Sequence, residues 1–262
     1  MVNEKIRLKL QNEATEEFLS RKNHQLKGSD VLVFIPVHNE EKTIATVIEK
    51  IKKVCDFDIL VVDDGSTDST NSIAKKVGVE VFEHHNNLGA MAVLSGLTVG
   101  HVLKYKYIIK IDGDDQHDAS DIPRLYNHAI KSDADIVIGS RHLEKYTSEL
   151  LSFKYFGMWF CSKLVTVLSG IEITDITSGY KIWNSKAAEI CIQAFNKRLF
   201  ADDSTVFIEE CLYAAKKRLK IEEINVIMYP RLYGESKSFS KKKIILFPLN
   251  LMRSVWKVLV SN

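Results

Sequence analysis

Four aspartates crowd into seven consecutive residues, and this part of the chain has the side chains best suited to chemistry. The run Asp112-Gly113-Asp114-Asp115-Gln116-His117-Asp118 follows the apolar stretch 107–111, which is typical of a buried strand. Two carboxylates about 4 Å apart repel each other by roughly 4 kcal/mol at an effective dielectric constant of about 20, so a cation would stabilise the run. Asp112, Asp114 and Gln116 offer only oxygen ligands, which predicts Mg²⁺ or Mn²⁺. A solvated acidic turn is the alternative, because Asp and Gly are common in turns.

Composition limits the class of protein. The chain has 262 residues, 45% apolar and 27% charged, which is typical of a folded protein with one large or two small domains. A formal net charge of +2, with no basic stripe in the first 230 residues, argues against nucleic acid as a partner. The cysteines lack zinc or disulfide spacing, so we expect core residues of a protein from a reducing compartment: Cys55, Cys161, Cys191 and Cys211. Residues 1–23 have helical spacing and no secretion signal, so we expect a cytoplasmic catalytic part.

Two segments have the pattern of helices that lie on a membrane surface. No stretch reaches the about 18 consecutive apolar residues of a membrane-spanning helix. However, residues 150–168 and 244–260 are rich in aromatic and aliphatic residues, and three lysines at 241–243 precede the second segment. Basic residues near an anionic surface contribute about 1 kcal/mol each, and an apolar helix face adds to this. We therefore expect peripheral attachment to the cytoplasmic face of a membrane, with two buried helices as the alternative.

Strand and helix patterns alternate from residue 30 to residue 139. Apolar runs predict strands at 31–36, 58–62, 79–83, 105–111 and 135–139. Helical spacing predicts helices at 40–54, 67–77 and 89–104, and Asp121 and Pro123 are typical of the cap and first turn of another helix. This alternation predicts an α/β fold with a mostly parallel central sheet and helices on both faces. Ligands of such folds bind beyond the carboxyl ends of the strands.

Polar clusters follow three of the predicted strands at that edge. They are Pro36-Val37-His38-Asn39-Glu40, Asp63-Asp64-Gly65-Ser66 and the acidic run at 112–118. The chain lacks both the glycine-rich dinucleotide fingerprint after its first strand and a Walker-type Gly-Lys-Ser/Thr sequence. A nucleotide would therefore be held by carboxylates on its base and ribose, with the metal reaching its diphosphate.

Six short motifs in order resemble those of family 2 glycosyltransferases, most closely the branch of dolichyl-phosphate mannose synthases and polyprenyl-phosphate sugar transferases. Besides the three loops, they are Gly139-Ser140-Arg141, Thr177-Ser178-Gly179-Tyr180-Lys181 and Gly234-Glu235-Ser236-Lys237. The resemblance covers residues 30–240 and implies a glycosyltransferase type-A (Rossmann-like) fold, a nucleotide-diphosphate sugar donor and inversion at the anomeric carbon. We expect an N-terminal helical extension at 1–29, the catalytic domain at 30–240 and a basic amphipathic segment at 241–262.

The resemblance also implies roles for individual residues. The donor would be bound by Pro36, His38, Glu40, Asp63, Asp64, Gly89, Asp112, Gly113, Arg231 and Lys237. Asp112, Asp114 and Gln116 would hold Mg²⁺ or Mn²⁺ against the diphosphate. The acceptor would be bound by Arg141, Lys154, Thr177 and Ser178. Catalysis would depend on Asp112, Asp114, Arg141 and Glu210.

Two positions depart from the family pattern. Ala90 and Met91 follow Asn87-Leu88-Gly89, where relatives often have Lys or Thr, so one contact to the donor phosphate is missing. Lys154 occupies the place of an arginine and would act as a point charge.

The sequence leaves the acceptor open. A lipid phosphate is already ionised and needs cations such as Arg141 and Lys154 to position it. A sugar hydroxyl needs a general base, for which Glu210 is the candidate, either as the base or as an orienting group. The alternative for Glu209 and Glu210 is a solvated helix start, since acids suit a helix N-terminus.

Our first hypothesis is an inverting, metal-dependent transferase that moves a hexose from a nucleotide-diphosphate sugar to a polyprenyl (dolichyl or undecaprenyl) phosphate. The alternatives are transfer to a glycan or glycolipid hydroxyl, a non-catalytic nucleotide-sugar binding module, and a nucleotidyltransferase, which the missing glycine-rich basic loop disfavours. The sugar, the base and any homo-oligomer are left open. Among single residues, His84 and His85 are predicted on a turn surface, His117 as orienting the acidic run, and Trp183 in the core.

Overall fold

The computed structural model describes residues 4–21, 26–84, 89–143, 162–163, 165–167, 170–196, 206–233, 252–253, 255–258 and 260. Lys154, Lys237 and most of the two predicted surface segments lie outside these ranges. Within the described part of the chain, every helix is too short or too polar to cross a membrane.

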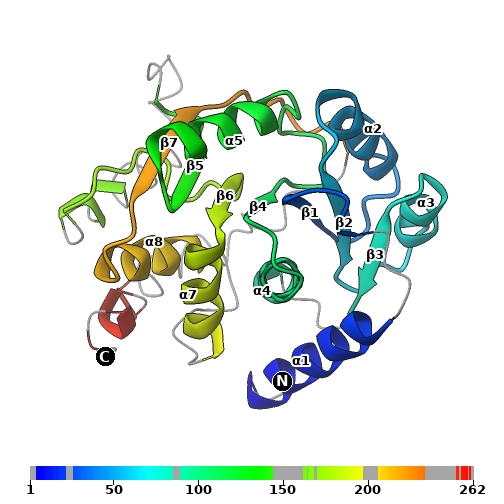
Figure 1. Cartoon of the computed structure of the whole chain (residues 1–262), viewed down its shortest axis with the longest axis horizontal. Coiled ribbons are helices and arrows are strands. Elements are labelled where there is room, and N and C mark those ends of the chain that lie inside the picture. The colour runs from blue at the N-terminus through cyan, green and yellow to red at the C-terminus, as the bar shows by residue number, and fades with distance from the viewer. Residues whose placement is uncertain are drawn as a thin grey trace.

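A seven-stranded sheet forms the centre of the molecule, in the order β3-β2-β1-β4-β6-β5-β7 (Figure 1). Its strands are β1 (Val31–Val37), β2 (Asp58–Asp63), β3 (Glu80–Glu83), β4 (Tyr107–Lys110), β5 (Ile136–Ser140), β6 (Lys181–Asn184) and β7 (Ile221–Asn225). Only β6 runs antiparallel to its neighbours, β4 and β5, among the pairs that the described strands form. The predicted mostly parallel α/β sheet is therefore confirmed, whereas β6 and β7 were not predicted.

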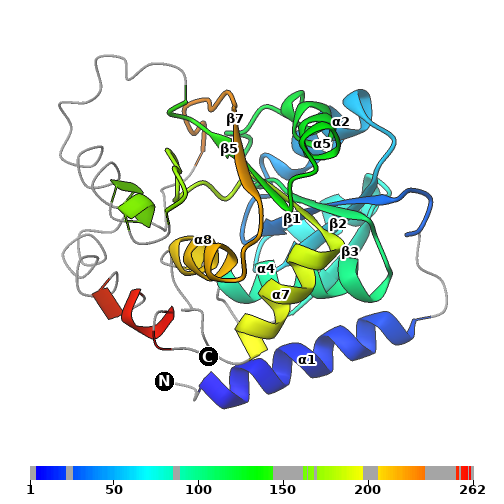
Figure 2. The same ribbon diagram turned by 60° about the vertical axis from the view of Figure 1, so that its left-hand side comes forward.

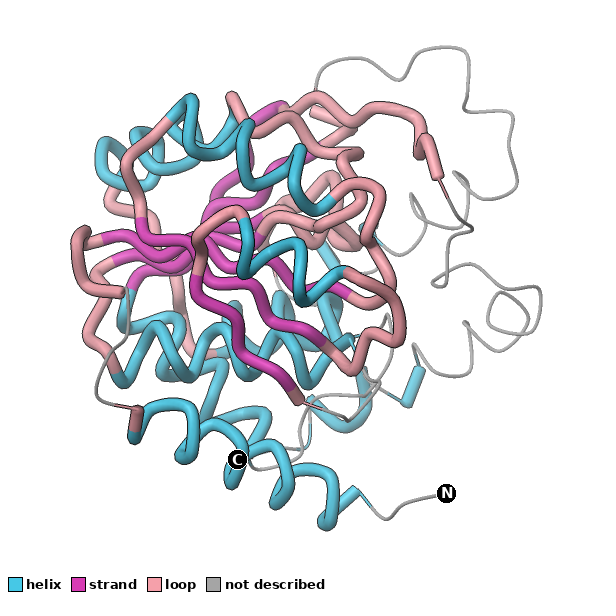
Figure 3. Tube along the Cα trace, turned by 90° about the vertical axis from the view of Figure 1, so that its right-hand side faces the viewer, coloured by secondary structure: helices cyan, strands magenta, loops and turns pink. Residues whose placement is uncertain are grey.

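Helices cover both faces of the sheet, as predicted (Figure 3). One face carries α2 (Ile44–Val54), α3 (Thr70–Lys76) and α5 (Asp121–Ser132). The other carries α4 (Gly89–Val102), α7 (Ser185–Asn196) and α8 (Val206–Lys216), with α1 (Glu4–Ser20) outside α4 (Figure 2). Successive side chains of a strand point to opposite faces, so Leu32 and Phe34 of β1 enter one core while Val31, Val33 and Ile35 enter the other.

Two predicted helices begin later than expected because their first residues form the loops of the sheet edge. α2 begins at Ile44 and not at residue 40, with Thr43 in its cap position. α3 begins at Thr70 and not at residue 67, because the backbone N–H of Thr67 donates to Asn39 Oδ1 at 2.8 Å. These two loops are therefore tied to each other.

The predicted capping role of Asp121 is wrong. Ser120 occupies the cap position, and Asp121 is the first helical residue of α5. The buried carboxylate of Asp121 pairs with Arg124 and accepts the backbone N–H of Ile227 at 3.0 Å. It thus fastens the chain after β7 to α5.

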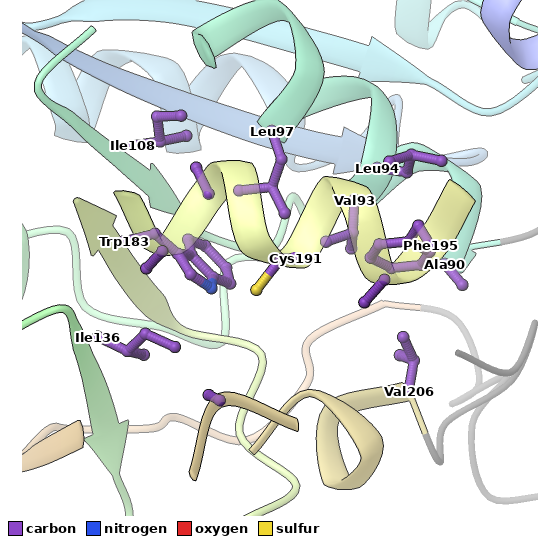
Figure 4. Close-up of a cluster of buried hydrophobic side chains, with 14 of the residues drawn as sticks. Ala90, Val93, Leu94, Leu97, Ile108, Ile136, Trp183, Cys191, Phe195 and Val206 are labelled. Atoms are coloured by element: carbon purple, nitrogen blue, oxygen red, sulfur yellow. The ribbon is translucent and has the colours of Figure 1, made fainter. Parts of the chain in front are cut away.

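Close packing fixes α4 against the sheet. A Cβ on Gly100 would come within 2.5 Å of Ile108 Cδ1, and one on Gly96 would overlap the Phe34 ring, so the helix approaches β1 and β4 more closely than alanine would allow. Figure 4 shows side chains of α4, α7 and the strands meeting in this core, including Leu97, Ile108 and Trp183. The start of α4 at Gly89 is thereby held near the functional edge of the sheet.

Candidate active site

The three polar loops converge, as the sequence predicted. The backbone N–H of Asp64, after β2, donates to the carbonyl of Val37 at the end of β1 at 2.9 Å. Thr43 Oγ1, beyond the β1 loop, donates to the carbonyl of Gly113 in the acidic run at 2.7 Å. Carboxylates from separate strands therefore line one edge of the sheet.

Asp112 is held between two basic side chains. Lys110 Nζ pairs with its Oδ1, and His117 Nε2 lies 3.4 Å from its Oδ2. Burial alone would raise the pKa of Asp112, but Lys110 and His117 hold it well below its ordinary value, so the carboxyl is ionised. Its side chain is 37% exposed, which leaves it accessible to a ligand. The prediction that His117 orients the acidic run agrees with this contact.

Asp114 has the opposite electrostatic environment. Burial raises its pKa, and the negative charge of Asp112 raises it further. A carboxyl with a raised pKa beside an ionised one is a site where a cation would relieve repulsion. This observation fits Mg²⁺ or Mn²⁺, which proteins commonly bind through one or two carboxylates and substrate phosphates. Among the described residues, no three His, Cys, Asp or Glu side chains are arranged so that they could hold a metal ion together, so the metal site stays a prediction.

Gln116, the third predicted ligand, is anchored by the chain after β7. Its side-chain nitrogen donates to the carbonyl of Tyr229 at 3.1 Å, a contact that does not use its oxygen. The backbone N–H of Tyr229 donates to the carbonyl of Gln116 at 2.7 Å, and Tyr229 Oη donates to Asp118 at 3.0 Å.

Arg231 spans two of the loops. One guanidinium nitrogen lies 2.5 Å from Glu40 Oε1, and another lies 3.7 Å from Asp114 Oδ2. The structure thus brings together Glu40, Asp112, Gly113, Asp114, Gln116 and Arg231.

The two aspartates after β2 have different environments. Asp63 is buried, and its carboxylate accepts the backbone N–H of Ser66 at 2.9 Å and the side-chain N–H of Asn71 at 3.2 Å. Asp64 Oδ1 instead lies 3.3 Å from His84 Nδ1. Asp63 therefore shapes the loop in this structure, whereas the carboxylate of Asp64 lies against a histidine ring.

Of the remaining predicted donor residues of the first loop, His38 lies beside Asp64 and Pro36 lies within β1. His38 Nδ1 donates to the carbonyl of Asp64 at 2.8 Å. Pro36 pairs in register with Val62 of β2. Gly89 begins α4, directly after residues 85–88, which lie outside the described part of the chain.

Three of the four predicted acceptor residues, Arg141, Thr177 and Ser178, lie together at the end of β5, and Lys154 lies outside the described residues. The guanidinium of Arg141 forms two contacts with Asp175, at 2.5 and 2.7 Å, and donates to Thr177 Oγ1 at 2.9 Å. Burial would raise the pKa of Asp175, but Arg141 holds it below its ordinary value. Ser178 is buried and donates to the carbonyl of Gly139 at 2.7 Å, so it shapes the backbone beside Arg141.

The sequence model of Glycosyl transferase family 2 matches residues 32–189, which is more than half of the 262-residue chain. The chain belongs to glycosyl transferase family 2. It is similar to "Uncharacterized protein MJ1222" of Methanocaldococcus jannaschii, with 32% identity over 178 residues that cover 66% of this chain and 73% of the relative. It is also similar to the polyprenol monophosphomannose synthase of Mycolicibacterium smegmatis, with 29% identity over 170 residues, 60% of this chain and 63% of that protein.

Solved structures show the same fold. Glucosyl-3-phosphoglycerate synthase from Mycobacterium tuberculosis, in complex with Mn²⁺, UDP and glucosyl-3-phosphoglycerate, superposes with a TM-score of 0.64. The match has 18% identity and covers 96% of this chain and 85% of that protein. This glycosyltransferase therefore has the type-A fold that its motifs implied, and its family consists of enzymes, which removes the non-catalytic binding module as an alternative.

Glu210 of this glycosyltransferase lies in the core. One carboxylate oxygen accepts from Lys181 Nζ at 2.8 Å, and the other accepts from Trp183 Nε1. Glu209 is 1% exposed and Glu210 4%, so the alternative of a solvated helix start is wrong. Trp183 is fully buried, as predicted. A general-base role for Glu210 would require its present contacts to break, and it stays a prediction.

Sequence reasoning missed or misplaced three polar residues of this glycosyltransferase. None of the three is exposed: they are Lys110, Glu223 and His84. His84 is 2% exposed, so the prediction that it lies on a turn surface is wrong. Glu223 of β7 accepts the backbone N–H groups of Thr174 and Asp175 at 2.7 and 2.9 Å and thereby holds the turn that presents Asp175 to Arg141. For Lys110 the available signal was a lysine inside an otherwise apolar strand.

The cysteines are mostly core residues, as predicted. Cys191 and Cys211 are buried, and Cys55 is partly buried, with all three in the thiol form. Cys161 lies outside the described residues.

Gly179 keeps Lys110 against Asp112. A Cβ at this position would lie 2.6 Å from Lys110 Nζ and 3.3 Å from Phe207 Cζ. We expect Gly179→Ala to displace the ammonium group and to lower the rate of sugar transfer by about tenfold, since residues that orient ligands of a site often contribute this much. Steady-state assays at several Mn²⁺ concentrations measure the effect. Removing Lys110 as well relieves the overlap, so the double variant Gly179→Ala/Lys110→Ala should be no slower than Lys110→Ala. An unchanged rate for Gly179→Ala would contradict the close packing.

Proposed function

We propose that this glycosyltransferase transfers a hexose, with inversion, from a nucleotide-diphosphate sugar to a polyprenyl phosphate at the cytoplasmic surface of a membrane. The carrying observation is the pair of Asp112 and Asp114 at the convergence of three loops, one ionised and the other with a raised pKa. Such a pair favours a divalent cation and, through it, a diphosphate leaving group.

The donor would lie across the edge of β1, β2 and β4. Asp64 and His38 would face the base and ribose, and Arg231 would release Asp114 to bind the diphosphate. Asp112, Asp114 and Gln116 would hold Mg²⁺ or Mn²⁺, which would neutralise the charge that develops on the diphosphate. Lys237, Gly89 and Gly113 would complete the donor pocket.

Two observations support a phosphate acceptor. Both carboxylate oxygens of Glu210, the candidate base, accept from Lys181 and Trp183, and an ionised phosphate needs no base. The relative from Mycolicibacterium smegmatis is named polyprenol monophosphomannose synthase, and this name describes a sugar joined to a polyprenol through one phosphate. In this proposal Arg141, with Thr177 and Lys154, would receive the phosphate by charge-assisted hydrogen bonds.

Exposed apolar side chains near the C-terminus support peripheral attachment. Met252 is 68% exposed and Trp256 69%, while Val258 is buried and its carbonyl accepts from Lys216 of α8 at 2.9 Å. An aromatic side chain presented in this way suits the interface between water and lipid.

The test is transfer to a phosphorylated lipid and to its matched alcohol. Purified protein is incubated with Mn²⁺, labelled UDP-sugars or GDP-sugars, and either polyprenyl phosphate or the corresponding polyprenol. We expect an organic-soluble labelled sugar from the phosphate only, and NMR should show an inverted anomeric configuration. Transfer to the alcohol or to a glycan hydroxyl, with none to the phosphate, would replace the proposed acceptor by a hydroxyl.

A further inference from the structure

A line of aromatic contacts joins the N-terminal helix to a carboxylate of the proposed donor site. Phe18, at the end of α1, is fully buried, and its ring centroid lies 5.1 Å from that of Phe82 in β3. The Phe82 ring in turn lies 5.7 Å from the His84 ring. His84 Nδ1 then lies 3.3 Å from Asp64 Oδ1. In Figures 1 and 2 the C-terminal end of α1 correspondingly approaches β3.

His84 can act on Asp64 but is shielded from a ligand. The His84 side chain is 1% exposed and the Asp64 side chain 7%, so the histidine lies on the protein side of the carboxylate. Its backbone N–H donates to the carbonyl of Asp63 at 3.0 Å, which fixes the residue at the end of β3. A buried imidazole 3.3 Å from a carboxylate oxygen limits the orientations that the carboxylate can adopt. His84 therefore fits a positioning residue.

The neighbouring aspartate does not have this arrangement. The carboxylate of Asp63 is engaged by Ser66 and Asn71 of its own loop, so its orientation is set locally. The carboxylate of Asp64 instead lies against the His84 ring, which is packed on Phe82, and Phe18 of α1 contacts Phe82.

A polar contact anchors α1 elsewhere along its length. Gln11 Nε2 donates to Ser95 Oγ of α4 at 3.3 Å and to Thr15 Oγ1 at 3.0 Å, and Gln11 is fully buried. Gln11 does not belong to the line that leads to Asp64, and it offers a control that perturbs the same helix.

We propose that α1 is a supporting part of the donor site, although it lies outside the matched family region 32–189. Through Phe18 and Phe82, α1 holds His84 in place. His84 in turn positions Asp64 for the nucleotide. This inference rests on the proposed donor function and extends it to a helix that the family pattern does not include. Asp64 contacts the nucleotide, His84 orients Asp64, and α1 supplies the surface against which the stack is packed.

Calorimetric titration with UDP and GDP in the presence of MnCl₂ tests the role of His84. His84→Phe retains a ring against Phe82 but lacks the N–H, whereas His84→Gln retains an N–H donor. We expect His84→Phe to raise the dissociation constant of the better nucleotide about tenfold, because Asp64 loses the polar side chain that lies against its carboxylate and orients it. His84→Gln should lie closer to the wild type than to His84→Phe. In an Asp64→Asn background, His84→Phe should have little further effect.

The same titration tests the role of α1. Phe18→Ala should weaken nucleotide binding, whereas Gln11→Ala should lower the melting temperature and leave nucleotide binding unchanged. Thermal melts without nucleotide show that each variant is folded, and Phe18→Leu replaces Phe18→Ala if the latter is not.

The outcomes separate the inference from the function on which it rests. Additive effects of His84→Phe and Asp64→Asn, or equal effects of Phe18→Ala and Gln11→Ala on nucleotide binding, would overturn the inference alone. Wild-type protein that binds neither nucleotide, or an Asp64→Asn variant that binds as well as the wild type, would overturn the donor assignment and the inference together.

Discussion

Asparagine in place of Asp114 is expected to slow sugar transfer strongly and to remove the Mn²⁺ dependence of nucleotide binding. The carboxyl of Asp114 has a pKa that burial and Asp112 both raise, so this position gains most from a cation. Asparagine keeps the shape and removes the charge that would hold the metal against the diphosphate. We expect a loss of about 10²- to 10³-fold in kcat, the range found when one electrostatic group of a preorganised site is removed. Initial rates and Mn²⁺ titration by calorimetry measure both effects.

Asp115→Asn is the matched control. Asp115 belongs to the same run, but its carboxylate pairs with Lys50 of α2 at 2.7 Å. Its backbone has a left-handed φ of 61°, which asparagine adopts readily, so the substitution should not distort the loop. The metal assignment would fail if Asp114→Asn retained Mn²⁺ binding, or if both variants lost activity equally.

Methionine in place of Lys181 is expected to cause the largest loss of stability. Lys181 is fully buried beside Glu210; burial lowers its pKa, but Cys211 and Glu210 raise it above the ordinary value, so the ammonium group stays charged. Removing it leaves the Glu210 carboxylate buried without its cation, although Trp183 still donates to it. Breaking a buried pair in this way costs about 3–5 kcal/mol in the free energy of unfolding. Urea unfolding followed by circular dichroism measures the change.

A second substitution should restore most of this stability. In Lys181→Met/Glu210→Gln the buried charge is gone, and the glutamine oxygen can still accept from Trp183. A double variant as unstable as Lys181→Met would show that Lys181 contributes by packing and not by charge. The single variant Glu210→Gln also tests catalysis, because a general base at this position predicts a large fall in kcat with nucleotide binding intact.

The strands that consist almost entirely of apolar residues could be predicted from the sequence. β1, β2 and β4 are largely apolar because helices cover both faces of the sheet. The loops that follow these strands contain three of the six motifs by which the family was predicted. β6 and β7 were missed because β6 holds the buried Lys181, and β7 carries Glu222 and Glu223 in its middle. Charges in a strand are tolerated only where tertiary partners satisfy them, and the pattern of one segment does not contain its partners.

The same reason explains the polar residues that were missed at the site. His84 is buried because α1 supplies Phe18 against Phe82, from a part of the chain far from the loop motif. Glu223 acts on the turn at 174–175, about 50 residues earlier in the chain, so no local spacing shows its role. The sequence motifs were sufficient to locate the loops of the site. The residues that orient the side chains of these loops come from distant segments, so only the structure reveals them.

The antiparallel strand β6 lies between β4 and β5, so the chain leaves the sheet at Ser140 and re-enters it at Lys181. The described residues between these two strands include Arg141, Asp175 and Thr177, whereas Asp64, Asp112 and Asp114 follow β2 and β4, which come earlier in the chain. In the proposed function, the described acceptor residues and the carboxylates of the donor site thus belong to separate stretches of sequence. In this proposal, a change of acceptor would require substitutions in the segment between β5 and β6 and would leave Asp64, Asp112 and Asp114 in place.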